Sequence, residues 1–144
     1  MRVEVWVEVR PTEDEDKIKR ALSNVFIYDE IRMEKSEDKS YLVAFGSGFK
    51  SLVKIHELIK EQGIEDSARS ILMRGIDGNR VVFHVHKQAA YAGILTFVTE
   101  RNESPLGPIT FIVDSSDPRR LIDWLAPRTS RGKRLYEVTP PDDP

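Results

Sequence analysis

Two of the three histidines have a spacing that could support chemistry. His84 and His86 lie two positions apart in a segment where apolar and polar residues alternate. In a strand both imidazoles would lie on one face, where they could share a metal ion or act as an acid/base pair. His56 falls on a predicted helix, and no carboxylate is clearly placed to complete a site. We therefore expect surface or interface histidines and predict no metal site.

Nucleophilic catalysis has no recognisable arrangement in this chain. The segment Gly46-Ser47-Gly48 precedes a predicted helix, so its backbone N–H groups could hold a phosphate. It lacks the length and the lysine of a phosphate-binding loop, and a turn between strand and helix is the simpler interpretation. The sequence has no Cys, which excludes thiolate chemistry and Cys-based zinc sites. We predict a protein that is not an enzyme and has no cofactor.

The basic residues give the strongest indication of a ligand. Arg69 and Arg74 flank a predicted helix, Arg80 begins the next strand, and Lys87 follows its end. Between residues 119 and 134 a second cluster contains six basic residues and a single acidic one, Asp123. Such clusters suit phosphate binding, although a solvated polar tail explains the second one equally simply. The net charge of −2 means that any nucleic acid would bind local patches.

Trp6 stands out in the first strand. Val3, Val5 and Val7 alternate with polar residues and face a core, which places Trp6 on the opposite face between two glutamates. There it could stack on a base or enter a dimer contact. The flanking carboxylates would repel a phosphate backbone, so we favour burial by a partner chain or by a later segment.

The pattern along the chain predicts an α+β fold. Strands are expected at residues 2–10, 27–35, 41–45, 80–86, 95–99 and 109–113. Helices are expected at 49–62, 65–74, from 117 onward, and after a capping box of Thr12 and Glu15. The order β-α-β-β-α-α-β-β-β-α favours a two-layer sandwich, a mainly antiparallel sheet with helices on one face and the other face open.

The length of 144 residues fits one domain, which we place at residues 1–129. Residues 130–144 are polar and rich in proline, and we expect a flexible tail there. No basic leader with an apolar segment is seen at the start, and no apolar run is long enough to cross a bilayer. The expectation is a cytoplasmic protein that does not enter a membrane.

Four motifs in order closely resemble an uncharacterised archaeal protein family described as a predicted exosome subunit with an RNA-binding role. They are Asp66-Ser67-Ala68-Arg69, Lys87-Gln88-Ala89-Ala90, Ser104-Pro105-Leu106-Gly107-Pro108-Ile109 and Ile122-Asp123-Trp124-Leu125-Ala126-Pro127-Arg128-Thr129. The resemblance implies a fold like that of the large-subunit ribosomal protein that binds 5S rRNA. It marks Arg69, Lys87, Gln88 and Arg128 as candidate RNA contacts. At Arg69 and Arg128 a guanidinium equally suits a structural carboxylate such as Asp66 or Asp123.

The interpretation we favour is an RNA-binding module, accessory to RNA processing or degradation, whose cations contact phosphates. The alternative is a homo-oligomeric protein-interaction scaffold that packs two copies through the open sheet face near Trp6. The RNA hypothesis requires the distant cations to gather on one surface. The candidate RNA-contacting residues are Arg69, Arg74, Arg80, Lys87, Gln88, Arg128, Arg131, Lys133 and Arg134.

Overall fold

The computed structural model, which describes residues 1–99, 107–130, 133–134 and 139–140, is built on one antiparallel sheet. The six strands follow the order β2-β3-β1-β6-β5-β4, and each pairs antiparallel with its neighbours. The valines of the first strand face the core, as their alternation predicts. The strands are β1 (Arg2–Val9), β2 (Glu30–Ser36), β3 (Lys39–Ser47), β4 (Ile76–Asp77), β5 (Arg80–Val85) and β6 (Ile109–Asp114).

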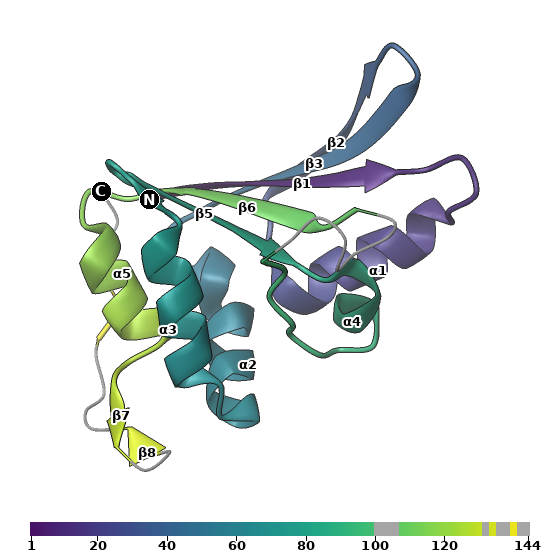
Figure 1. Ribbon diagram of the computed structural model, residues 1–144. Helices are drawn as coiled ribbons and strands as arrows, with labels where there is room; N and C mark the ends of the chain where they lie inside the picture. The colour runs from purple at the N-terminus through teal and green to yellow at the C-terminus, as the bar shows by residue number, and fades with distance from the viewer. Residues whose placement is uncertain (100–106, 131–132, 135–138, 141–144) are drawn as a thin grey trace.

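The helices form the second layer and cover one face of the sheet (Figure 1). They are α1 (Glu15–Val25), the 3-10 turn η1 (Phe49–Leu52), α2 (Val53–Gln62), α3 (Glu65–Arg74), α4 (Lys87–Tyr91) and α5 (Pro118–Leu125). Their apolar faces, with Leu22, Ile59 and Leu121, are buried together with Val5 and Phe111 of the sheet. This arrangement confirms the predicted α+β architecture with an antiparallel sheet and helices on one side.

The predicted strand at residues 95–99 is wrong. This segment forms only one isolated bridge, between Phe97 and Val85. It lies along the part of β5 that the two-residue strand β4 leaves unpaired, and Val98 N–H donates to the His84 carbonyl at 2.9 Å. The chain also forms the short helix α4, which the sequence analysis did not anticipate. The nearly continuous apolar run of this segment satisfies both a strand and a buried loop, which is why periodicity alone was misleading.

The first helix begins differently from the predicted capping box. Asp14 is the N-cap of α1, and its Oδ1 accepts a hydrogen bond from Asp16 N–H at 2.9 Å. Glu13, the residue before the N-cap, does not cap the helix. Its Oε1 accepts from Arg10 N–H at 3.0 Å, which places the Glu13 carboxylate beside the end of β1.

The chain after α5 contains a small paired element. Strand β7 (Thr129–Ser130) pairs antiparallel with β8 (Lys133–Arg134), next to α3 in Figure 1. The sequence predicts only a flexible polar tail over residues 130–144. The boundary of the domain near residue 129 stays a prediction.

Candidate nucleic-acid interface

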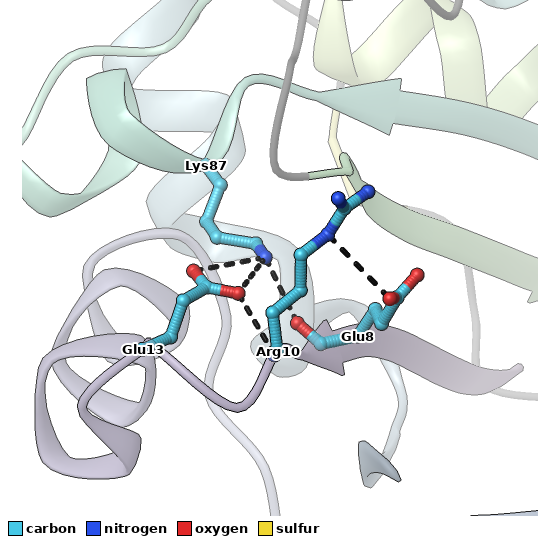
Figure 2. A network of polar contacts seen from close by, with 4 residues as sticks. All are labelled: Glu8, Arg10, Glu13 and Lys87. Atoms are coloured by element: carbon cyan, nitrogen blue, oxygen red, sulfur yellow. Dashed lines mark hydrogen bonds and ion pairs between the residues drawn. The ribbon is translucent and has the colours of Figure 1, made fainter. Parts of the chain in front are cut away.

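Lys87 points into the protein. It is the first residue of α4, directly after His86, whose Nδ1 accepts from Ala89 N–H at 3.1 Å and caps the helix. The Lys87 Nζ donates to the carbonyl oxygen of Glu8 at 2.8 Å and to both carboxylate oxygens of Glu13 at 3.1 and 3.2 Å (Figure 2). The side chain of Lys87 is 4% exposed and that of Glu13 is 10% exposed. The two therefore form a largely buried ion pair between the β1–α1 loop and the start of α4.

Two effects act in opposite directions on the pKa of Lys87. Burial lowers the pKa of Lys87 below its ordinary value, while the hydrogen bond and charge of Glu13 oppose that change. Arg10 and Glu8 form a second pair next to it, with Arg10 Nε 3.5 Å from Glu8 Oε2 (Figure 2). The expectation that Lys87 offers its charge to a phosphate is thus corrected, because the ammonium group is enclosed and its donors are used within the protein.

Gln88 has a different environment from Lys87. It is exposed on α4 and lines a surface depression whose lining also includes Lys17, Lys87, Glu13 and Asp14. The two carboxylates balance the two lysines, so this depression is not a strongly cationic surface. Gln88 remains accessible to a ligand, but not as part of a phosphate-binding cluster with Lys87.

Arg69 joins two helices. Its Nη1 lies 2.7 Å from Asp123 Oδ1 of α5 and also donates to the Ala126 carbonyl at 3.2 Å. The Arg69 side chain is only 16% exposed. The carboxylate alternative noted for this arginine is therefore the one that the structure adopts, and Arg69 fastens α3 to the end of α5.

Arg74 and Arg80 lie at the surface but in separate places. Arg74 is exposed on the last turn of α3, where its Nε donates to the Ser70 carbonyl at 3.3 Å. Arg80 begins β5 and pairs with Asp114 of β6, with Nε 3.0 Å from Oδ1. This hydrogen bond raises the pKa of Arg80. Its charge is thus partly neutralised by a carboxylate of the neighbouring strand β6.

Arg128 is an exposed cation that shares a depression with Arg69. The two residues line one shallow depression, together with Asp66, Ser70, Met73 and Thr129. Asp66 Oδ1 accepts a hydrogen bond from Thr129 Oγ1 at 2.7 Å, and no ion pair joins Asp66 to an arginine among the described residues. Within the part of the chain that the structure describes, no ion pair joins Arg128 to a carboxylate. Its guanidinium is available to an anion.

Further basic residues lie around α5. Arg119 and Arg120 are exposed on its first turn, and Lys133 is exposed on β8. Arg120 Nη2 contacts Thr139 Oγ1 at 3.4 Å. Arg134 belongs to β8 by its backbone, and Arg131 lies outside the described residues. We call the exposed cations Arg74, Arg119, Arg120, Arg128 and Lys133 the α3/α5 basic group after the helices they lie on or next to; within it, Arg74 lines a different depression from Arg128.

The predicted cations do not form one surface. Arg80 begins β5 and Lys87 follows its other end, seven positions later, which corresponds to roughly 20 Å along a strand. Arg69 and Arg128 meet, as their shared depression shows, whereas Lys87 lies with α1 and Glu13. The structure therefore separates an enclosed cation from the α3/α5 basic group. The run of basic residues between 119 and 134 is the sequence signal for this group.

The open face of the sheet holds the other residues of interest. Trp6 is half-buried, its Nε1 donates to Glu4 Oε1 at 3.0 Å, and its ring meets Tyr41 edge-on with centroids 5.6 Å apart. His84 Nδ1 shares a hydrogen bond with Thr110 Oγ1 at 2.9 Å. His56 is far from this face in the fold and stacks on Trp124. Among the described residues, no three His, Cys, Asp or Glu side chains gather as metal ligands.

Comparison with known proteins identifies the class to which this chain belongs. A family model described as RNA binding matches residues 2–114, a range that ends before α5. The chain belongs to the UPF0201 protein family. A UPF0201 protein of Pyrobaculum aerophilum is 55% identical over 99% of this chain and 100% of its own length, and that of Pyrobaculum calidifontis is 53% identical over the same shares.

A solved structure supports the same conclusion. The crystal structure of a UPF0201 protein from Methanococcus jannaschii superimposes with a TM-score of 0.79 at 30% sequence identity. It covers 94% of this chain and 100% of that one. The similarity therefore extends over nearly the whole fold. In the described residues, no helix has the length and apolar character needed to cross a membrane.

Proposed function

We propose that this protein binds RNA through the α3/α5 basic group, as a non-enzymatic accessory to RNA processing or degradation. The observation that carries the proposal is the exposure of Arg128 and Lys133 on adjoining elements, without a carboxylate partner among the described residues. Such cations gain favourable energy by displacing the counterions that surround phosphates. The family model described as RNA binding supports the choice of ligand.

The location of the cations suggests how RNA is contacted. The group combines the end of α3, the first turn of α5 and the hairpin of β7 and β8, so its charges are spread over several elements. A spread of point charges suits the phosphate backbone of a structured RNA better than the edges of single bases. We therefore expect binding with little sequence preference and a strong dependence on salt.

The experiment is a fluorescence anisotropy titration of the full chain with a structured RNA at several salt concentrations. The variant Arg128→Glu with Lys133→Glu should bind roughly tenfold more weakly at low salt, and the slope of log K against log salt should fall by about 2. The matched control is Lys17→Glu with Lys50→Glu, which changes the net charge equally on exposed residues elsewhere. It should bind much more like the wild type.

Two results would contradict the proposal. Wild-type protein that fails to bind at low salt, or that binds independently of salt, excludes phosphate binding. An equal loss in both double variants excludes the α3/α5 basic group as the location and leaves only a general effect of net charge.

The second candidate function is a homo-oligomeric scaffold that uses the open sheet face. The aromatic side chains on that face favour it, because Tyr41 and Phe45 lie on the same side of the sheet as Trp6. Light scattering coupled to size-exclusion chromatography provides the test. A dimer whose Trp6 emission shifts on dissociation supports this function, whereas a monomer argues against it.

A further inference from the structure

The outer edge of β2 has no partner strand among the described residues. Strand β2 ends the sheet and pairs only with β3, so a row of its backbone N–H and C=O groups faces outward. The hairpin of β2 and β3 projects beyond the helix layer in Figure 1. No described helix therefore stands between this edge and an approaching chain.

The side chains of β2 alternate in charge. Glu30, Arg32 and Glu34 share the open face of the sheet, where Arg32 Nε lies 2.9 Å from Glu34 Oε1 and 4.0 Å separate its Nη1 from Glu30 Oε1. Charges on an edge strand commonly prevent pairing with another copy. Here the signs alternate, so an antiparallel copy meets opposite charges and the usual obstacle is removed.

We propose that two copies of this chain pair antiparallel along their β2 edges, with Met33 on the two-fold axis. In this register Arg32 of one protomer lies opposite Glu34 of its partner, and Glu34 lies opposite the partner's Arg32. All seven residues of β2 are then paired. The two six-stranded sheets join into one continuous sheet, and the same patch serves both protomers, as two-fold symmetry requires.

The environment of the central residues fits this register. Met33 is 37% exposed in the single chain, and the two-fold axis brings it against its own copy. Opposite charges directly across an antiparallel pair are stabilising, and here they occur twice. In an antiparallel pair, two residues directly opposite each other form either a hydrogen-bonded or a non-hydrogen-bonded pair, and a two-fold axis can pass through both kinds. The proposed register therefore does not depend on which residues of β2 point their N–H groups outward. This proposal is independent of RNA binding.

Analytical ultracentrifugation of two charge-reversal variants tests the pairing. Arg32→Glu makes residues 32 and 34 both acidic, and Glu34→Arg makes both basic, so each variant repels its own copy. We expect wild-type dimers, and a dimer dissociation constant raised on the order of tenfold for each single variant. A 1:1 mixture of the two variants should dimerise again, because the acidic strand then faces the basic one.

Matched controls separate this edge from other surfaces. The pair Lys50→Glu and Glu61→Arg places the same charge reversals outside β2 and should leave the dimer unchanged. The combined variant Arg32→Glu with Glu34→Arg restores both cross-strand pairs within one chain and should dimerise like the wild type. Circular dichroism confirms that each variant is folded.

The proposal is overturned if the wild-type chain is monomeric at 100-fold the protein concentration used for RNA binding. If the RNA dissociation constant is micromolar, this concentration is on the order of 0.1 mM. It is also overturned if a dimer persists equally in both single variants. A dimer that resists both reversals and shifts Trp6 emission on dilution would assign the contact to the open sheet face. Loss of the dimer in both single variants and its recovery in their mixture, with the Lys50→Glu and Glu61→Arg controls unchanged, assigns the contact to the β2 edge.

Discussion

Lys87 and Arg128 are both cations that follow a regular element, yet their surroundings are opposite. Lys87 begins α4 shortly after β5, with its ammonium group within hydrogen-bond distance of two carboxylate oxygens and a carbonyl. Arg128 follows α5 and faces solvent beside a shallow depression. The first cation holds two distant parts of the chain together, and the second is available to a ligand. The environment of a charge, more than its presence in a motif, decides which use it has.

The largest effect expected within this comparison is the loss of Glu13. The change Glu13→Ala leaves the buried ammonium of Lys87 without its carboxylate, so we expect the free energy of unfolding to fall by about 3 kcal/mol. Denaturant unfolding measures it. The control Glu15→Ala removes an exposed partner of Lys19 and should cost only about 0.5 kcal/mol.

A double variant sharpens this result. Glu13→Leu with Lys87→Met removes both charges and fills similar volume, so it should recover most of the loss seen with Glu13→Ala. RNA affinity should stay at the wild-type value in the double variant. A marked loss of RNA binding in this double variant would mean that Lys87 contacts RNA, and it would contradict the separation of Lys87 from the α3/α5 basic group.

A smaller effect is expected for Arg69, whose partly exposed side chain joins two helices. Arg69→Ala removes the contact with Asp123 and the hydrogen bond to the Ala126 carbonyl, at an expected cost of about 2 kcal/mol. Thermal unfolding measures the cost. Because Arg69 also positions the helix end that carries Arg128, RNA binding should weaken as well, but with an unchanged salt slope.

The pH dependence of stability gives a further test of the enclosed lysine. The pKa of Lys87 is lowered in the folded protein, so the unfolded chain holds this proton more tightly just below the ordinary value of 10.5. The contribution of Lys87 to stability therefore rises as pH increases through that range. Loss of Glu13 lowers the folded pKa further and should extend the rise to lower pH, which unfolding at a series of pH values detects.

The smallest effect on stability is expected in the exposed region. Arg128→Glu should change the free energy of unfolding by at most about 0.5 kcal/mol while it weakens RNA binding. Chemical unfolding and anisotropy on the same preparation check both. A large loss of stability would mean that Arg128 has a structural role like that of Arg69, and the contrast with Lys87 would fail.

Much of the architecture followed from local patterns. The alternation of Val3, Val5 and Val7 predicts β1, and Gly63 adopts the left-handed conformation expected of a helix end, with φ of 64°. The bounds of α3 agree with the prediction, because charged residues flank a short apolar face. These features depend on neighbours in the sequence, which is why periodicity suffices to predict them.

The site depended on contacts that no local pattern contains. Glu13 and Lys87 are 74 positions apart, and nothing near Lys87 indicates that its side chain turns inward. The sequence does contain a signal for Arg69, because Asp123 is one of the carboxylates that suit its guanidinium. For Lys87, the start of α4 sets the direction of the side chain, and this five-residue helix is too short for periodicity to reveal it.

The enclosed amine has a practical consequence for following how the molecule opens. Amine-reactive reagents modify exposed lysines such as Lys17 and Lys50 in the native state, whereas the Lys87 nitrogen is shielded by the β1–α1 loop. Its modification requires that loop to detach. The rate at which Lys87 is modified, measured by mass spectrometry, therefore reports how often the first strand separates from α4.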